Sequence, residues 1–525
     1  MNALKSIGKN MPLFFLIIFF NSFNPSFANQ DVNPRGDFVG SQKCKTCHQD
    51  VYKEWQGTRH ANVMRKLYTK DNNSISAPWG TEKEPKVITT SNKDRKFTLF
   101  MKGKKYWVTI HDKKDPNREL SYQIDAVGYT SQTMFFTYVE ESDSLMILPF
   151  NYWNNEEKQE RWGNAFDLFW FNDDGSISSD EKLATFEQFH NYENRCAECH
   201  LTGFNVETWT DAGKLGRSAD KTNIWTTTEF AIGCEKCHGP GAAHAKSRDK
   251  KDIVNPENLD SKTGSEECDQ CHQSGHPINY DNGFWSELPI KFDEKNPLGQ
   301  GQHYNVGDKL DEFYVDNVRK KWAGTDYFQQ GKSYTMQIES TKHFQNGMNC
   351  KTCHDPHTQK TRLPANDLCL SCHNKDKGTA KHQGNSHMQA DVNCVDCHMP
   401  YGMISFLRST RYDGRLHVFK AITPTESLAQ FNYLKQFTLP DADPEAKLTK
   451  SWEKINKDFG SCYDSVKHPK NVHYCTDFDV LPNACSSCHK SEFPQPGKFD
   501  DTQVERLHKA EARYQQLTDH MKKAM

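Results

Sequence analysis

The sequence has 525 residues, and its 66 lysines and arginines nearly balance 69 aspartates and glutamates, for a formal net charge of −3 at pH 7. This balance lacks the basic excess of nucleic-acid-binding proteins, so no nucleic-acid partner is expected. Hydrophobic residues make up 35% of the chain, which falls below the apolar share of a typical globular domain. The core therefore needs apolar mass from another source.

Residues 1–28 have the pattern of a secretory signal peptide. Lys5 and Lys9 give a basic start, residues 13–20 are apolar, and residues 26–28 form a small-x-small cleavage site. The apolar stretch is shorter than the about 20 residues of a membrane span. We expect cleavage, no transmembrane segment afterwards, and export to the periplasm or to the outer surface.

The chain has 18 cysteines, and most of them repeat one motif, Cys-x-x-Cys-His. Random placement predicts about 0.03 copies of this motif, which is typical of c-type heme attachment. The copies are Cys44-Cys47-His48, Cys196-Cys199-His200, Cys234-Cys237-His238, Cys268-Cys271-His272, Cys350-Cys353-His354, Cys369-Cys372-His373, Cys394-Cys397-His398 and Cys485-Cys488-His489.

Each motif predicts one covalent heme c, numbered 1–8 here in chain order. The two cysteines form thioether bonds with the heme, and the histidine is the proximal ligand of the iron. Zinc sites would not explain why a histidine follows every cysteine pair. Eight apolar macrocycles also supply the missing core. We expect a mainly α fold with much irregular structure, organised around stacked hemes.

Strand patterns occur between hemes 1 and 2. Apolar residues alternate at 97–101 and 106–110, around a turn that contains Gly103. Further strands are expected at 122–127 and 145–150. This predicts a small antiparallel β insertion near residues 80–170.

Helical spacing returns at the end of the chain. It predicts a surface helix over 501–525. The expected organisation is a signal peptide at 1–28, a part with hemes 1–4 and the β insertion at 29–290, a part with hemes 5–8 at 291–500, and the C-terminal helix at 501–525.

The second axial ligand of each iron is less certain from sequence, because 15 of the 23 histidines lie outside the motifs. A six-coordinate heme takes a second histidine or a methionine. His357 follows His354 too closely to reach the opposite face of the same heme, so it would serve a neighbouring one. The candidate distal ligands are His60, His244, His357 and His417, followed by His190, His303, His343 and His387.

Two further cysteines, Cys462 and Cys475, lie outside the motifs. In an oxidising compartment they would form a disulfide, worth about 3 kcal/mol. The alternative is a pair of soft thiolates that hold Cu(I) beside an open heme.

Several segments resemble known exported cytochromes. Residues 38–61, 194–200 and 233–244 resemble the cytochrome c-552/4 family, and residues 348–373 resemble a doubled CxxCH module. The resemblance implies an exported octaheme c-type cytochrome with closely stacked hemes and with His60, His244 and His357 as distal ligands. Related octaheme enzymes reduce sulfite, tetrathionate or nitrite, or oxidise hydroxylamine. This chain departs from them, since no motif ends in lysine and none has a long gap between its cysteines.

These features favour an electron carrier over an enzyme. Its partners would be other redox proteins: a quinol dehydrogenase, small cytochromes or a terminal reductase used in anaerobic respiration. The alternative is an oxidoreductase acting on a small nitrogen or sulfur oxyanion at one open heme. Arg408, Arg411, Tyr412 and Arg415 could bind such an anion, or could pair with heme propionates. Assembly into an oligomer stays open.

Overall fold

The computed structural model describes the residues between 37 and 484 that follow. They are 37–69, 74–90, 92–129, 132–139, 144–154, 162–172, 174–184, 192, 196–206, 209–210, 214–215, 225–273, 275–278, 290–291, 302–316, 322, 325–328, 334–373, 393–403, 414–435 and 481–484. Several predictions lie outside them: the signal peptide, the C-terminal helix, the motif of heme 8, His190, His387, Arg408, Arg411, Tyr412, and the pair Cys462 and Cys475.

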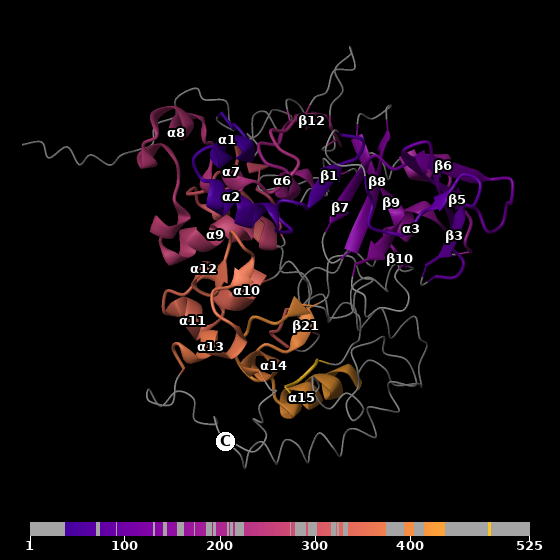
Figure 1. Ribbon diagram of the computed structural model, residues 1–525. Helices are drawn as coiled ribbons and strands as arrows, with labels where there is room; N and C mark the ends of the chain where they lie inside the picture. The colour runs from indigo at the N-terminus through magenta and orange to yellow at the C-terminus, as the bar shows by residue number, and fades with distance from the viewer. Residues whose placement is uncertain are drawn as a thin grey trace, which may run out of the picture. The chain divides into compact units, whose positions relative to one another are not determined.

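A five-stranded antiparallel sheet follows the first heme motif, and its strands β7, β8 and β9 run side by side in Figure 1. Its order is β1 (Met64–Lys66), β7 (Ala126–Tyr129), β8 (Gln132–Val139), β9 (Ser144–Trp153) and β10 (Trp162–Asn164). Every residue of β9 is buried. The strand is therefore covered on both faces and shows no alternation of apolar and polar residues.

A second five-stranded sheet forms from the residues between β1 and β7. It contains β2 (Gly80–Thr81), β3 (Lys86–Thr89), β4 (Lys96–Lys102), β5 (Lys105–His111) and β6 (Glu119–Gln123). The pair β2–β4 is parallel and the other pairs are antiparallel. Gly103, with φ of 62°, closes the β4–β5 hairpin, a conformation that glycine adopts without steric cost.

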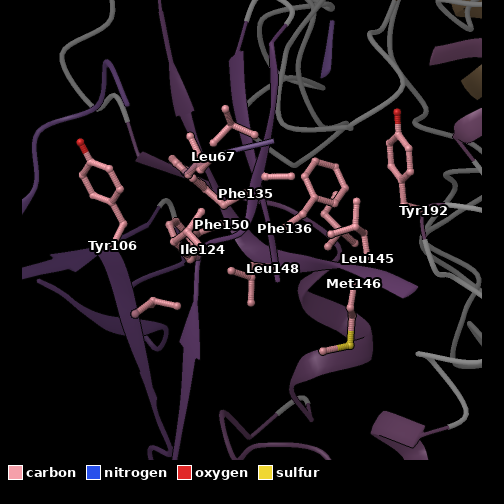
Figure 2. Close-up of a cluster of buried hydrophobic side chains, with 14 of the residues drawn as sticks. Leu67, Tyr106, Ile124, Phe135, Phe136, Leu145, Met146, Leu148, Phe150 and Tyr192 are labelled. Carbon is pink, nitrogen blue, oxygen red and sulfur yellow. The ribbon is translucent and has the colours of Figure 1, made fainter. Parts of the chain in front are cut away.

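The largest apolar core joins the two sheets. Phe97 and Val108 from the second sheet and Phe135 and Phe150 from the first belong to this one cluster. The rings of Phe135 and Phe150 stack with centroids 4.8 Å apart, and Figure 2 shows both beside Ile124. The heme-free residues thus build a conventional hydrophobic core of their own.

The remaining strands pair as short two-stranded ribbons. They are β11 (Asn205–Val206) with β14 (Trp225–Thr226), β12 (Trp209–Thr210) with β13 (Lys214–Leu215), β15 (Gly275–Pro277) with β18 (Tyr314–Asp316), β16 (Ile290–Lys291) with β17 (Gln302–His303), β19 (His354–Asp355) with β20 (Lys360–Thr361), and β21 (Tyr401–Met403) with β22 (Gly414–Arg415).

The helices are short, and seven of them coincide with heme motifs within the described residues. These are α1 (Ser41–Lys45), α6 (Ala197–His200), α7 (Cys234–His238), α9 (Ser261–His272), α12 (Cys350–Cys353), α13 (Ala365–Leu370) and α14 (Cys394–His398). The others are α2 (Gln49–Gln56), α3 (Asp167–Trp170), α8 (Ala242–Ser247), α10 (Tyr334–Glu339), α11 (Lys342–Gln345) and α15 (Pro424–Lys435).

The expectation of a mainly α fold is wrong. About 27% of the described residues lie in strands, in several antiparallel sheets. The β part is also larger than a small insertion near residues 80–170, because it contains two five-stranded sheets and begins at β1, Met64–Lys66. One helical turn is enough to present a heme motif, so the motifs contribute little helix, while the residues between them form sheets. The division at residue 290 stays a prediction.

Candidate heme-binding sites

One helical turn positions the groups of several motifs within the described residues. The amide of the motif histidine donates to the carbonyl of the first motif cysteine in His48 (2.9 Å), His200 (2.9 Å) and His373 (2.8 Å). Residues three and four apart share a helix face, so both sulfurs and the imidazole point the same way. This suits a flat macrocycle attached through two sulfurs with its iron over the imidazole.

Three motif histidines each face a second histidine from elsewhere in the chain. The ring centroids of His48 and His244 are 6.3 Å apart, and those of His60 and His272 are 6.4 Å apart. The rings of His238 and His357 lie 6.2 Å apart, with planes only 2° from parallel. The partner of His238 thus follows the motif of heme 5, and the partner of His272 follows the motif of heme 1.

Two further motif histidines have the same arrangement. The ring centroids of His354 and His417 are 6.4 Å apart. His373 lies 5.6 Å from His343, and their Nε2 atoms are 3.4 Å apart. An iron about 2 Å from each of two opposed imidazole nitrogens separates the ring centroids by about 6 Å. The ring separations of the five pairs therefore suit bis-histidine heme irons, and the Nε2 atoms of His343 and His373 would have to separate to about 4 Å around an iron.

Hydrogen bonds orient several of these rings. The Nδ1 atoms of His238, His244 and His417 lie 2.9, 2.8 and 3.0 Å from the carbonyls of Val254, Asp249 and Arg415. A ring whose Nδ1–H donates to a carbonyl presents the lone pair of Nε2, as an axial ligand requires.

Burial favours the neutral form of five of the ligand candidates. It lowers the pKa of His60 and of His417 to about 4, with a smaller contribution from neighbouring histidines. Burial likewise lowers the pKa of His238, His343 and His354 below the ordinary value. Neutral imidazoles are the form that binds a metal.

Cysteine sulfurs of different motifs touch. The thiols of Cys44 and Cys234 interact, which joins motifs 1 and 3. The corresponding contacts elsewhere are Cys199 with Cys271, Cys268 with Cys350, and Cys369 with Cys394. The helices agree, since α1 lies against α7, α9 against α12, and α13 against α14. The attachment points of hemes 1 and 3, 2 and 4, 4 and 5, and 6 and 7 are neighbours.

Buried ion pairs join the same segments. Lys236 Nζ lies 2.9 Å from Glu198 Oε1, and these intervening residues of motifs 3 and 2 are 5% and 1% exposed. Lys351, in motif 5, lies 2.9 Å from Glu267, directly before motif 4. Neither ion pair was predicted from the sequence. The only signal was a charged residue inside or beside a motif, which does not reveal its partner.

Other predicted residues have different surroundings. His303 is fully buried, and its Nδ1 lies 3.1 Å from Glu198. The ring of His200 lies 6.3 Å from that of Tyr192. Arg415 binds within the protein: its guanidinium pairs with Asp396 at 2.8 Å and lies 4.2 Å from the centre of the Tyr401 ring. Its positive charge is thereby paired with a carboxylate of the protein.

Two limits apply to the described part of the chain. It contains no helix long and apolar enough to cross a membrane. It also contains no cluster of three or more histidine, cysteine or acidic side chains that could hold a metal ion by themselves.

Comparison with known proteins defines the class. Residues 36–282 match the family described as outer membrane cytochrome MtrC/MtrF-like, domains II/IV. Residues 342–405 match the cytochrome c3 family. Together with the attachment motifs, these matches show that the chain is a multiheme c-type cytochrome, which carries covalent heme c and transfers electrons.

Individual relatives are more distant. The chain is 24% identical over 345 residues to the dissimilatory sulfite reductase MccA of Wolinella succinogenes, and the match covers 61% of this chain and 41% of that protein. It therefore spans about two fifths of the relative's length. Among solved structures, the outer cell wall cytochrome OcwA is 17% identical, with a TM-score of 0.48, covering 91% of this chain and 99% of that one. The octaheme sulfite reductase MccA of W. succinogenes is 17% identical, with a TM-score of 0.28, covering 75% and 60%.

Proposed function

We propose that the protein is an exported octaheme electron conduit whose irons are mostly bis-histidine. The observation that carries this proposal is the set of five histidine pairs whose ring centroids lie 5.6 to 6.4 Å apart. An iron held by two histidines has no open position for a substrate, so it exchanges electrons and does not bind small molecules.

The sulfur contacts suggest the route of the electrons. Heme edges carry the thioether bonds, so touching sulfurs bring neighbouring edges together. Heme 4 is the junction, because Cys271 meets the attachment of heme 2 and Cys268 meets that of heme 5. Distal ligands also connect hemes whose motifs lie far apart in the sequence. His60, after motif 1, would serve heme 4, and His357, after motif 5, would serve heme 3.

The complete cofactor set is eight hemes, with the motif Cys485-Cys488-His489 holding the last. Distal ligands for hemes 2, 7 and 8 would come from His190, His303 and His387. The cytochrome c-552/4 resemblance of residues 38–61, 194–200 and 233–244 supports the same closely stacked arrangement.

The site of action would be the periplasm or the outer surface. The signal-like residues 1–28 support export, and the matched family is described as outer membrane cytochromes. At either place the partners would be other redox proteins, one that donates electrons and one that accepts them.

A second candidate function is the reduction of a small nitrogen or sulfur oxyanion. The similarity to a sulfite reductase over 61% of the chain favours it. Such a reaction needs one heme with a vacant axial position and nearby cationic groups for the anion. Arg415 is bound to Asp396 and to backbone carbonyls, so its charge is already paired within the protein.

Reoxidation of the reduced protein separates the two functions. The fully reduced holoprotein is mixed anaerobically with sulfite, nitrite, tetrathionate or hydroxylamine, and separately with an oxidised small cytochrome. A conduit reoxidises quickly with the cytochrome and no faster than free heme with the small molecules. Catalytic turnover of any of these small molecules would show that the protein is an enzyme and would contradict the proposed role as a conduit.

A further inference from the structure

Two aromatic rings lie against the axial histidines of successive hemes. The centroid of the Phe419 ring lies 4.7 Å from that of the His343 ring and 6.1 Å from that of the His417 ring. The angles between the ring planes are 53° and 81°, respectively. His343 is paired with the motif histidine of heme 6, and His417 with that of heme 5. Phe419 therefore contacts the ligand pairs of both hemes.

Tyr334 repeats this arrangement one heme further along. Its ring is 4.9 Å from that of His417, at 82°, and 6.3 Å from that of His272, at 64°. His272 belongs to heme 4. Edge-on contacts at such distances are favourable and fix the relative orientation of two rings. The described chain thus contains an alternating row of rings: His272, Tyr334, His417, Phe419 and His343.

The backbone at Phe419 supports a specific role. Its φ is 49°, in the left-handed region that bulky residues avoid. Such a conformation persists only where surrounding contacts impose it. The neighbouring His417 is held on both sides, since its amide donates to Gln337 Oε1 at 2.5 Å and its Nδ1 lies 3.0 Å from the carbonyl of Arg415.

The local packing also holds Tyr334 in place. It lies at the edge of a small core with Trp322, Met403 and Leu416. A Cβ atom on Gly414 would come within 2.8 Å of the Tyr334 hydroxyl oxygen. Glycine at this position therefore leaves the room that the tyrosine needs to reach both histidine rings.

We infer that Phe419 and Tyr334 are positioning residues that set the mutual orientation of the axial imidazoles of hemes 4, 5 and 6. The inference rests on the proposed bis-histidine ligation. The angle between two axial imidazole planes controls the g values of a low-spin ferric heme and affects its reduction potential. Each aromatic ring would therefore tune two successive hemes, and heme 5 would respond to both.

The test is low-temperature EPR together with a redox titration of the holoproteins carrying Phe419→Leu and Tyr334→Leu. Phe419→Leu should shift the g values and potentials of two low-spin hemes. Tyr334→Leu should also shift two, one of them shared with the first variant. Phe419→Tyr and Tyr334→Phe keep the rings and should match the wild type.

Phe313→Leu is the matched control, because Phe313 is a buried phenylalanine whose ring packs against Tyr304. It should leave every heme signal unchanged. Spectra of Phe419→Leu and Tyr334→Leu that superimpose on that of a low-spin wild type would overturn the inference and leave the conduit standing. A wild type without bis-histidine signals would instead overturn the proposed ligation.

Discussion

Replacing Lys351 by methionine should destabilise the protein strongly. Lys351 Nζ lies 2.9 Å from Glu267 Oε2 and 2.8 Å from the carbonyl of Gly264. The two side chains are 9% and 3% exposed. At this separation the attraction is about 6 kcal/mol for an effective dielectric constant of 20, and desolvation offsets much of it. Losing the lysine alone leaves a buried carboxylate, which costs about 3–5 kcal/mol.

Chemical denaturation of the holoprotein measures this loss as a lower midpoint at constant m-value. Lys113→Met is the control, because Lys113 pairs with Asp94 at the surface, with side chains 44% and 45% exposed, where ion pairs contribute little. Adding Glu267→Gln to Lys351→Met should recover part of the loss, since the stranded charge is gone. Equal midpoints for Lys351→Met and Lys113→Met would show that the buried pair stabilises the protein no more than a surface pair.

Three further outcomes are expected. Asp260 caps α9, and hydrogen bonds from a threonine hydroxyl and from backbone amides lower its pKa; Asp260→Ala should cost about 1 kcal/mol. Because the folded-state pKa is depressed, this deficit is complete above about pH 4 and shrinks as the pH falls through the folded-state pKa, whereas Asp260→Asn should retain most of the cap. The ring planes of His343 and His373 meet at 62°, and those of His238 and His357 at 2°, so the first pair should give a more anisotropic low-spin EPR signal. Similar signals from the two hemes would contradict these ring orientations. His357→Ala should convert one heme to high spin, and an unchanged spectrum would remove His357 as a ligand.

The local parts of the sites could be predicted from the sequence. Attachment depends on cysteines and a histidine within five consecutive residues, and one helical turn brings them together. A second ligand depends on the whole fold. His244 follows motif 3 but lies against His48, and His60 lies against His272 far along the chain. The sequence could rank such histidines by their context but could not assign each to an iron.

The fold was predicted less well for a related reason. Buried and partly buried residues alternate along β4 and β5, so the sequence pattern predicted both strands. β1 is three residues long and shows no period. The strand expected at 145–150 lies within β9, whose full length was not predicted because every residue of it is buried. The buried pairs Lys236–Glu198 and Lys351–Glu267 were also unreadable, because nothing in a single sequence links charges that far apart.

The proposed conduit has irons that are mostly held by two histidines and that carry electrons without binding substrate. Low-temperature EPR of the oxidised holoprotein, recorded with and without sulfite, nitrite and hydroxylamine, tests it most directly. A bis-histidine conduit should give low-spin signals that none of these compounds changes. A high-spin signal that one of them shifts would contradict it.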